Sequence, residues 1–207
     1  MPMTYYQNAD RYDLLPHPFK DFIPPGARYL VVGTFPAHTR SFKFYYSGEG
    51  NRFWEVLGLV FNHTFNVFSG DEAVKERKRF LTAQLIGMTD MHQLCYRKNK
   101  SSGDENLYPV FLTDIFDLLD QNPSVTTLVL TSRTDAVGAL GLLKIYFMQK
   151  GLTLPDQETI RHNILYTTFK HQNRAIDVYI PISPSRRVEH YSLQKLTVMY
   201  RYIFSDP

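Results

Sequence analysis

The regular alternation of short apolar runs with segments of helical periodicity most constrains what this chain can fold into. Residues 28–34 (RYLVVGT) and 125–130 (VTTLVL) are short, apolar and rich in β-branched side chains, which is typical of buried strands. Residues 51–62 carry apolar side chains at the spacing of a helix that buries one face. Strands that alternate with helices predict βαβ units, and therefore a three-layer α/β/α sandwich with a central, mostly parallel sheet.

The rest of the chain fits one domain of this class. The 207 residues are 43% hydrophobic, enough for one well-buried core, so we expect a single domain over residues 1–207. Residues 1–27 are rich in proline and aromatic side chains and are expected to form an irregular N-terminal arm. Further helices are expected at residues 72–85, 109–119, 135–149 and 188–204, and further strands at residues 86–93, 164–169 and 175–180.

Residue usage excludes several classes of protein. Cys95 is the only cysteine, so neither an intramolecular disulfide nor a cysteine-bound iron–sulfur cluster or zinc ion can form. The histidines lack metal-ligand spacing, and the sequence has no Gly-x-Ser-x-Gly elbow and no phosphate-cradling Gly-x-x-x-x-Gly-Lys-[Ser/Thr] loop. We therefore expect no metal and no cofactor, and the pattern argues against a serine hydrolase or a P-loop nucleotide hydrolase.

Charge and hydropathy limit the classes of partner and the cellular compartment that we expect. The formal net charge of +3 and the pI of about 8.9 permit a polyanionic partner without requiring one. The N-terminal residues lack the basic start and apolar run of a secretory signal, and no apolar stretch approaches the roughly 18 residues of a membrane helix. These features favour a cytoplasmic protein, and we expect a monomer without membrane contacts.

Three loops are candidates for a site. In open α/β sheets, ligands bind beyond the carboxyl ends of the strands. That rule selects residues 35–50 after the first expected strand, residues 90–106 after the second and residues 183–187 after the last. The three loops are far apart in sequence, yet the expected fold brings them together.

Three segments, taken in order, resemble the uracil-DNA glycosylase superfamily. The first, GTFPA followed by YYSGEGNRFW (residues 33–54), is the most specific, because hypoxanthine-type members have Gly-Ser-Phe-Pro-Gly and then a Tyr-Tyr run that ends in Asn-x-Phe-Trp. GMTDMHQLCYRKNKSSGD (residues 87–104) and PISPSRR (residues 181–187) match less specifically. The resemblance covers about residues 28–204. It implies the fold of that superfamily and the removal of a deaminated or mismatched base, hypoxanthine or uracil, from DNA.

The resemblance also implies roles for individual residues. Tyr46 corresponds to the aromatic residue on which the extruded base stacks, and Asp90 falls where the superfamily reads the base edge. Asn51 corresponds to an asparagine held to be important in the hypoxanthine-type branch. The remaining residues expected to contact the base belong to the first turn: Gly33, Phe35 and Pro36.

The residue types suit this chemistry, but each also has a structural interpretation. Glycosidic cleavage passes through an oxocarbenium-like state, so the attacking water needs only to be positioned, and Asn51 or Glu49 can do this. Asn51 can equally cap the helix that follows it. Tyr46 can be a core tyrosine, and Asp90 can cap a strand end. Both interpretations stay open for these residues.

The last loop is a candidate contact for the DNA backbone. Hydroxyl and guanidinium groups at a helix N-terminus suit a phosphate, although a capped, solvated helix start has the same composition. The residues concerned directly precede the last expected helix: Ser183, Ser185, Arg186 and Arg187.

Two departures from the family pattern leave a second function open. Phe35 stands where the mismatch-specific members have a water-positioning asparagine, a loss that the hypoxanthine-type branch shares. Residues 180–183 lack the histidine that opens the second motif of ordinary uracil glycosylases. The alternative to an active monofunctional glycosylase is therefore a catalytically inactive, nucleic-acid-binding relative that keeps the pocket. The expected partner is DNA in either case.

Overall fold

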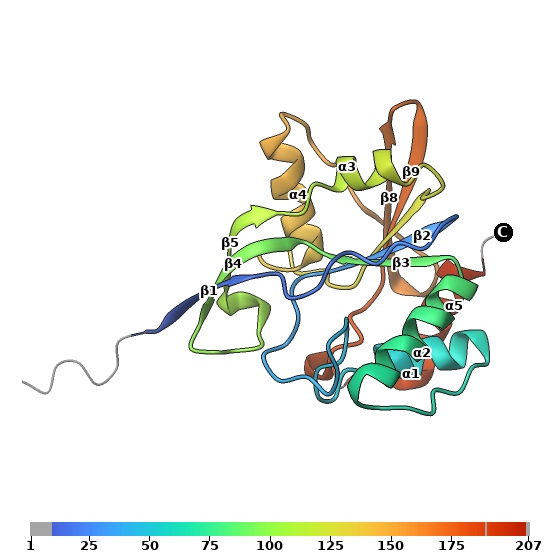
Figure 1. Cartoon of the computed structure of the whole chain (residues 1–207). Coiled ribbons are helices and arrows are strands. Elements are labelled where there is room, and N and C mark those ends of the chain that lie inside the picture. The colour runs from blue at the N-terminus through green and yellow to red at the C-terminus, as the bar shows by residue number, and fades with distance from the viewer. Residues whose placement is uncertain (1–9, 189, 206–207) are drawn as a thin grey trace, which may run out of the picture.

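Two β-sheets and five α-helices make up the structure, a computed structural model that describes residues 10–188 and 190–205 (Figure 1). The larger sheet has six strands in the order β3-β2-β6-β9-β8-β7. Its strands are β2 (Tyr29–Gly33), β3 (Ile86–Asp90), β6 (Thr127–Leu130), β7 (Glu158–Ile160), β8 (Ile164–His171) and β9 (Arg174–Ile180).

The central part of this sheet is parallel. Strand β2 pairs in parallel with β3 on one side and with β6 on the other, and β6 pairs in parallel with β9. Strands β8 and β7 complete the sheet in antiparallel order. In this register Gly33 at the end of β2 lies beside Asp90 at the end of β3. The prediction of a mixed α/β protein with a largely parallel central sheet is confirmed.

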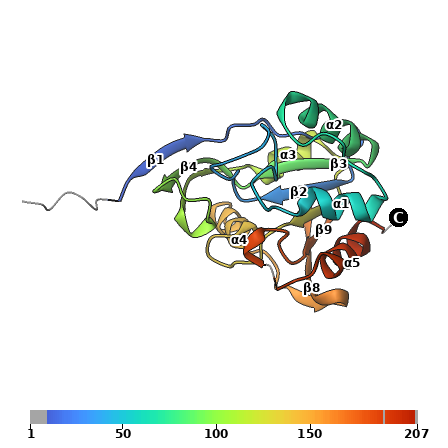
Figure 2. The ribbon, with the colours of Figure 1, turned by 90° about the horizontal axis from the view of Figure 1, so that it is seen from below.

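Helices cover both faces of the sheet, as Figures 1 and 2 show. Successive residues of β2 point to opposite faces, so Val31 joins one buried cluster and Leu30 and Val32 join another. This arrangement is compatible with three layers. The first cluster includes residues of α1 (Phe53–Phe61), α2 (Gly70–Ala83) and α5 (Leu193–Phe204), and the second includes residues of α3 (Ile115–Gln121) and α4 (Ala139–Gln149).

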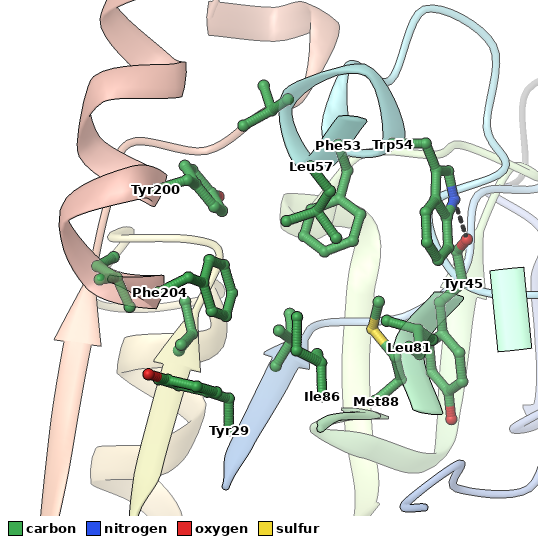
Figure 3. Close-up of a cluster of buried hydrophobic side chains, with 14 of the residues drawn as sticks. Tyr29, Tyr45, Phe53, Trp54, Leu57, Leu81, Ile86, Met88, Tyr200 and Phe204 are labelled. Carbon is green, nitrogen blue, oxygen red and sulfur yellow. Dashed lines mark hydrogen bonds between the residues drawn. The ribbon is translucent and has the colours of Figure 1, made fainter. Parts of the chain in front are cut away.

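The first cluster is rich in aromatic side chains (Figure 3). Phe204 of α5 meets Tyr29 of β2 edge-to-face, with 5.0 Å between the ring centroids. The buried Trp54 indole of α1 donates a hydrogen bond of 3.1 Å from Nε1 to the carbonyl oxygen of Tyr45. This bond fixes the first candidate loop to the start of α1. A buried indole that keeps its hydrogen bond avoids the cost of an unpaired polar group.

A second, three-stranded antiparallel sheet corrects the prediction of an irregular arm. Residues 12–16 form β1 (Tyr12–Pro16), which pairs with β4 (His92–Lys98), and β4 pairs in turn with β5 (Leu107–Leu112). The arm then continues along β3, where the backbones of Phe22 and Met88 exchange two hydrogen bonds. The partner of β1 lies some eighty residues further along the chain, so local composition cannot reveal this strand.

Two other predictions about secondary structure are wrong. Pro109 does not start a helix but lies in β5, opposite Cys95 of β4, in a strand with only one neighbour. Proline is tolerated in such an edge strand because its missing N–H would face away from the sheet. The last helix begins at Leu193 rather than near residue 188, because the Ser192 side chain accepts a hydrogen bond from Lys195 N (3.3 Å) and caps it.

No helix in the described part of the chain combines the length and the apolar character needed to cross a bilayer.

The packing of the second cluster predicts how much a core substitution lowers the free energy of unfolding. Leu128 is fully buried in β6, whereas Leu152, in the turn after α4, is 49% exposed. We expect Leu128→Ala to lower the free energy of unfolding by about 2–5 kcal/mol, because it removes buried methyl groups and leaves a cavity. Leu152→Ala, the matched control, should change it by less than about 0.5 kcal/mol. Urea denaturation followed by circular dichroism measures both, and equal effects would contradict the assignment of Leu128 to the core.

Candidate functional site

A cleft of about 620 Å³ opens at the carboxyl ends of the parallel strands. All three loops selected from the sequence contribute to it, and the segment directly after β6 does as well. The structure thus brings together residues that lie more than 150 positions apart in the chain. The predicted site residues that line the cleft are Phe35, Pro36, Tyr46, Glu49, Asn51, Asp90, Ser183, Ser185, Arg186 and Arg187.

Gly33 allows the floor of the cleft to form, although it is not itself part of the lining. A Cβ atom at this position would lie 2.2 Å from Asp90 Oδ1 and 2.9 Å from the Tyr46 hydroxyl oxygen. Both distances are far below normal van der Waals contact. Only glycine therefore lets the carboxyl group of β3 and the tyrosine of the first loop approach the end of β2 together.

Tyr46 presents an aromatic ring in the cleft. Its ring stacks on that of Phe53, with centroids 4.0 Å apart and planes inclined by 22°. Its hydroxyl group shares a hydrogen bond of 3.0 Å with Thr131 Oγ1. The backbone of Tyr46 has φ of 53°, an uncommon conformation for a bulky residue and one that is found disproportionately at functional sites. Burial raises the pKa of the Tyr46 hydroxyl well above its usual value, so this group stays protonated.

Asp90 forms a buried pair with His17, a residue of the N-terminal arm. His17 Nε2 lies 3.0 Å from Asp90 Oδ2, and the two side chains are 3% and 6% exposed. His17 Nδ1 lies 2.7 Å from the carbonyl oxygen of Phe19 and 3.2 Å from the backbone nitrogen of the same residue, so either tautomer of the ring finds a partner there. When Nε2 carries a proton, it donates to Asp90 Oδ2 and leaves the carboxylate an acceptor toward the cleft.

The His17–Asp90 pair holds a proton more firmly than a solvent-exposed histidine or aspartate would. Burial by itself would lower the pKa of His17, but the hydrogen bond and the charge of Asp90 outweigh it, so this pKa lies above its ordinary value. Burial raises the pKa of Asp90, and the hydrogen bond from His17 offsets only part of this rise. Both directions favour a proton shared between the two side chains at neutral pH.

Phe35 forms part of the wall rather than a polar contact. Its ring packs edge-to-face against those of His17 and His92, with centroids 5.4 and 6.2 Å away. The guanidinium of Arg97 lies 5.1 Å from the ring centroid and donates a hydrogen bond to the carbonyl oxygen of Pro36. Phe35 and Pro36 are therefore held from behind by buried side chains of β4, which fixes the turn that follows β2.

Asn51 and Glu49 differ in how firmly they are held. Asn51 Oδ1 accepts a hydrogen bond of 2.9 Å from the backbone N–H of Phe53, the first residue of α1. The expected capping function is thus present, although the capping position itself is Arg52, whose side chain makes no cap bond. The amide NH₂ group of Asn51 remains to contact a ligand. Glu49 is exposed at the rim of the cleft.

Arg52 fixes the last loop against the first. Its backbone N–H donates to the carbonyl oxygen of Pro184 at 3.0 Å. Its guanidinium donates to the carbonyl oxygens of Tyr191 and Val188, at 2.6 and 3.0 Å. The arginine that follows Asn51 in the sequence therefore holds together the two sides of the cleft.

The prediction that the last loop lies at a helix N-terminus is wrong. Residues 186–188 form a short 3₁₀ turn, and α5 starts five residues later, so this loop does not lead directly into α5. Ser183 Oγ and Ser185 Oγ instead accept hydrogen bonds within the loop, from the backbone N–H groups of Ser185 (3.2 Å) and Arg187 (3.4 Å). Such local hydroxyl bonds are typical of turns. The stem of Arg186 packs where a Cβ at Gly50 would lie only 2.7 Å from its Cδ.

Arg187 forms an exposed ion pair with Glu105. Both carboxylate oxygens of Glu105 accept from Arg187 Nη1, at 2.8 and 2.7 Å. This pair joins the last loop to the loop between β4 and β5. A phosphate would have to compete with Glu105 for the guanidinium group.

Several residues of the site were not selected from the sequence, among them Asp104 and Thr131 in the lining and His17 behind Asp90. Thr131 directly follows the clearest strand, so the strand-end rule applied to that strand would have found it. Asp104 lies within the SSGD of the second resembling segment but had no assigned role. His17 had no local signal, because only the pairing of β1 with β4 brings it to the cleft.

Within residues 10–188 and 190–205, no three histidine, cysteine, aspartate or glutamate side chains are grouped so that they could hold a metal ion. The polar side chains that line the cleft carry carboxyl, amide, hydroxyl, guanidinium and imidazole groups. Comparison with known proteins finds no protein-family model and no curated protein that matches this chain.

The buried pair predicts how stability varies with pH. The folded state binds the His17 proton more tightly than the unfolded chain, whose histidine has a pKa of about 6.5. The stabilisation is therefore complete below about pH 6.5 and is lost as the pH rises through the higher pKa of the folded state. We expect His17→Gln to flatten the decline of the unfolding free energy above pH 6.5, whereas the exposed control His38→Gln should not. Urea titrations from pH 5.5 to 9 test this, and equal slopes for wild type and His17→Gln would contradict it.

Proposed function

We propose that this protein is a DNA glycosylase with the three-layer fold of the uracil-DNA glycosylase superfamily, acting on a deaminated base flipped out of DNA. The observation that carries the proposal is the juxtaposition of Tyr46, stacked on Phe53, with the buried carboxyl group of Asp90 in one cleft. An enzyme that works on a flipped base needs an aromatic face for stacking and a polar group for the base edge. The volume of about 620 Å³ is in the range of small-molecule sites.

The His17–Asp90 pair supports a deaminated base as the substrate. A carboxylate can only accept hydrogen bonds, so it pairs with an edge that carries an N–H group. Hypoxanthine carries N1–H and uracil carries N3–H, whereas adenine and cytosine have an unprotonated nitrogen at the corresponding position. With the shared proton on His17, Asp90 therefore favours the deaminated bases over their normal parents.

The rest of the cleft fits the proposed hydrolysis. The Asn51 amide can orient the attacking water through its NH₂ group, because its oxygen is already bound to Phe53 N–H. Arg186 and Arg187 line the same cleft and supply positive charge for the DNA backbone. Their loop is held in place by Arg52.

One observation favours the alternative of a non-catalytic nucleic-acid-binding relative. Phe35 places an apolar ring, packed against His17 and His92, where the mismatch-specific enzymes have their water-positioning asparagine. A protein that keeps the stacking face and the acceptor but has lost hydrolysis would bind lesion DNA without cutting it.

Cleavage of defined lesions separates the two functions. The protein is incubated with duplexes that carry a single uracil, hypoxanthine, xanthine or mismatched thymine, and abasic sites are then revealed by alkaline cleavage. We expect strand breaks at hypoxanthine or uracil and none in an undamaged duplex. Binding to lesion duplexes without any strand break would support the non-catalytic alternative. Neither binding nor cleavage would reject both.

Substitution of Tyr46 tests the stacking face. Tyr46→Ala should weaken binding of the lesion duplex about 5- to 150-fold, because base stacking on an aromatic side chain contributes about 1–3 kcal/mol. Tyr46→Phe keeps the ring and loses only the hydrogen bond to Thr131, so it should bind nearly as well as wild type. Fluorescence anisotropy measures the binding, and thermal melting shows that each variant is folded. Equal affinities for wild type and a folded Tyr46→Ala would argue against stacking.

A further inference from the structure

The cleft holds three carboxyl groups in very different surroundings. Asp90 is buried and bound to His17, and Glu49 is exposed at the rim. Asp104 lies between these extremes, partly buried in the loop that joins β4 to β5. Differences of this kind separate the roles that carboxyl groups can take in one site.

Hydrogen bonds place Asp104 against the end of β2. Its Oδ1 accepts a hydrogen bond of 2.7 Å from the hydroxyl of Thr34, the residue directly before Phe35. A second bond joins the same two loops, from the backbone N–H of His38 to Ser102 Oγ at 3.0 Å. Asp104 is therefore fixed beside the turn in which Phe35 has replaced an asparagine of the mismatch-specific branch.

The neighbouring charges leave Asp104 without a salt bridge among the described residues. Arg187, whose charge acts on Asp104, is ion-paired through Nη1 with both oxygens of Glu105 instead. Asp104 thus keeps one carboxyl oxygen, Oδ2, for the cleft, while Oδ1 is held by Thr34. A carboxylate that is oriented but not neutralised can accept a proton from a water molecule.

Burial gives this carboxyl group unusual basicity. It raises the pKa of Asp104 to about 6, and although the Thr34 hydrogen bond opposes the rise, the negative charges of Asp90 and Glu105 add to it. The group is ionised at neutral pH, yet it is about a hundred times more basic than an ordinary aspartate.

The other carboxyl and amide groups of the cleft are less suited to take a proton from water. The Asn51 amide has no basic atom, and its oxygen is bound to the backbone N–H of Phe53. Asp90 already shares its proton with His17. Glu49 is exposed at the rim, and no described side chain is hydrogen-bonded to it.

We propose that Asp104 is a second catalytic residue beside Asn51: it helps to orient the attacking water and, as the catalytic base, accepts its proton while the bond to C1′ forms. This inference rests on the proposed glycosylase function. In the step, the water oxygen forms a bond to C1′ of the deoxyribose, and the C1′–N bond breaks with its electron pair moving to the base. Asp104 Oδ2 takes one proton from the water and later passes it to the departing base anion or to solvent. One water molecule is consumed, and the products are an abasic site and the free base.

The test compares Asp104→Asn with Asp156→Asn, the same change at an exposed aspartate that does not line the cleft. Asparagine keeps an oxygen that can accept from Thr34, so the fold and the melting temperature should be preserved. We expect Asp104→Asn to slow single-turnover cleavage of a lesion duplex about 10²- to 10⁴-fold, the range typical of general acid–base groups, while binding changes less than about twofold. Asp156→Asn should keep the wild-type cleavage rate.

The pH dependence of the cleavage rate distinguishes a catalytic base from a residue that only supports the fold, because only a catalytic base adds its own titration to this profile. The wild-type rate should fall below about pH 6 as Asp104 is protonated, and this limb should be absent in Asp104→Asn. An active wild type together with an Asp104→Asn variant of equal rate, or of equal pH profile, would overturn this inference alone. A wild type that cleaves none of the lesion duplexes would reject the proposed function, and the inference would fall with it.

Discussion

The parallel pairing of β2 with a strand on each side is the interaction on which the rest of the structure depends. All five residues of β2 are buried, and the strand contributes to both hydrophobic clusters. Because β3 and β6 run in the same direction, their ends and that of β2 lie side by side. The loops that follow these strands must then converge, and the missing side chain of Gly33 gives them room to meet.

Around this point, the site is held by groups that also serve the fold. Phe53 starts α1, supports the Tyr46 ring and donates its N–H to Asn51. Arg52 ties the last loop to the same helix start. Tyr46 and Asn51 are thus positioned by a residue only a few positions away in the sequence. The segment from Tyr46 to Phe53, the first residue of α1, therefore determines most of the geometry of one wall of the cleft.

The sequence predicted much of this because strand ends and helix starts leave local signals. The mixed α/β class, the positions of β2 and β6, and the convergence of the three loops all follow from apolar periodicity and the strand-end rule. Pro109 was misassigned because proline is compatible both with a helix start and with an edge strand. His17 was missed because the pairing that delivers it connects two distant segments, and no local pattern records such a pairing.

The pairing of His17 with Asp90 also has a consequence for how the protein is assembled. The two residues are 73 positions apart, and the strand that carries His17 toward the cleft pairs only with β4, which follows Asp90 in the chain. Contacts across such long loops form late, since the closure entropy must be paid before they contribute. During synthesis, β1 therefore cannot pair until β4 has been made. The His17–Asp90 contact at the floor of the cleft can form only after that pairing is possible.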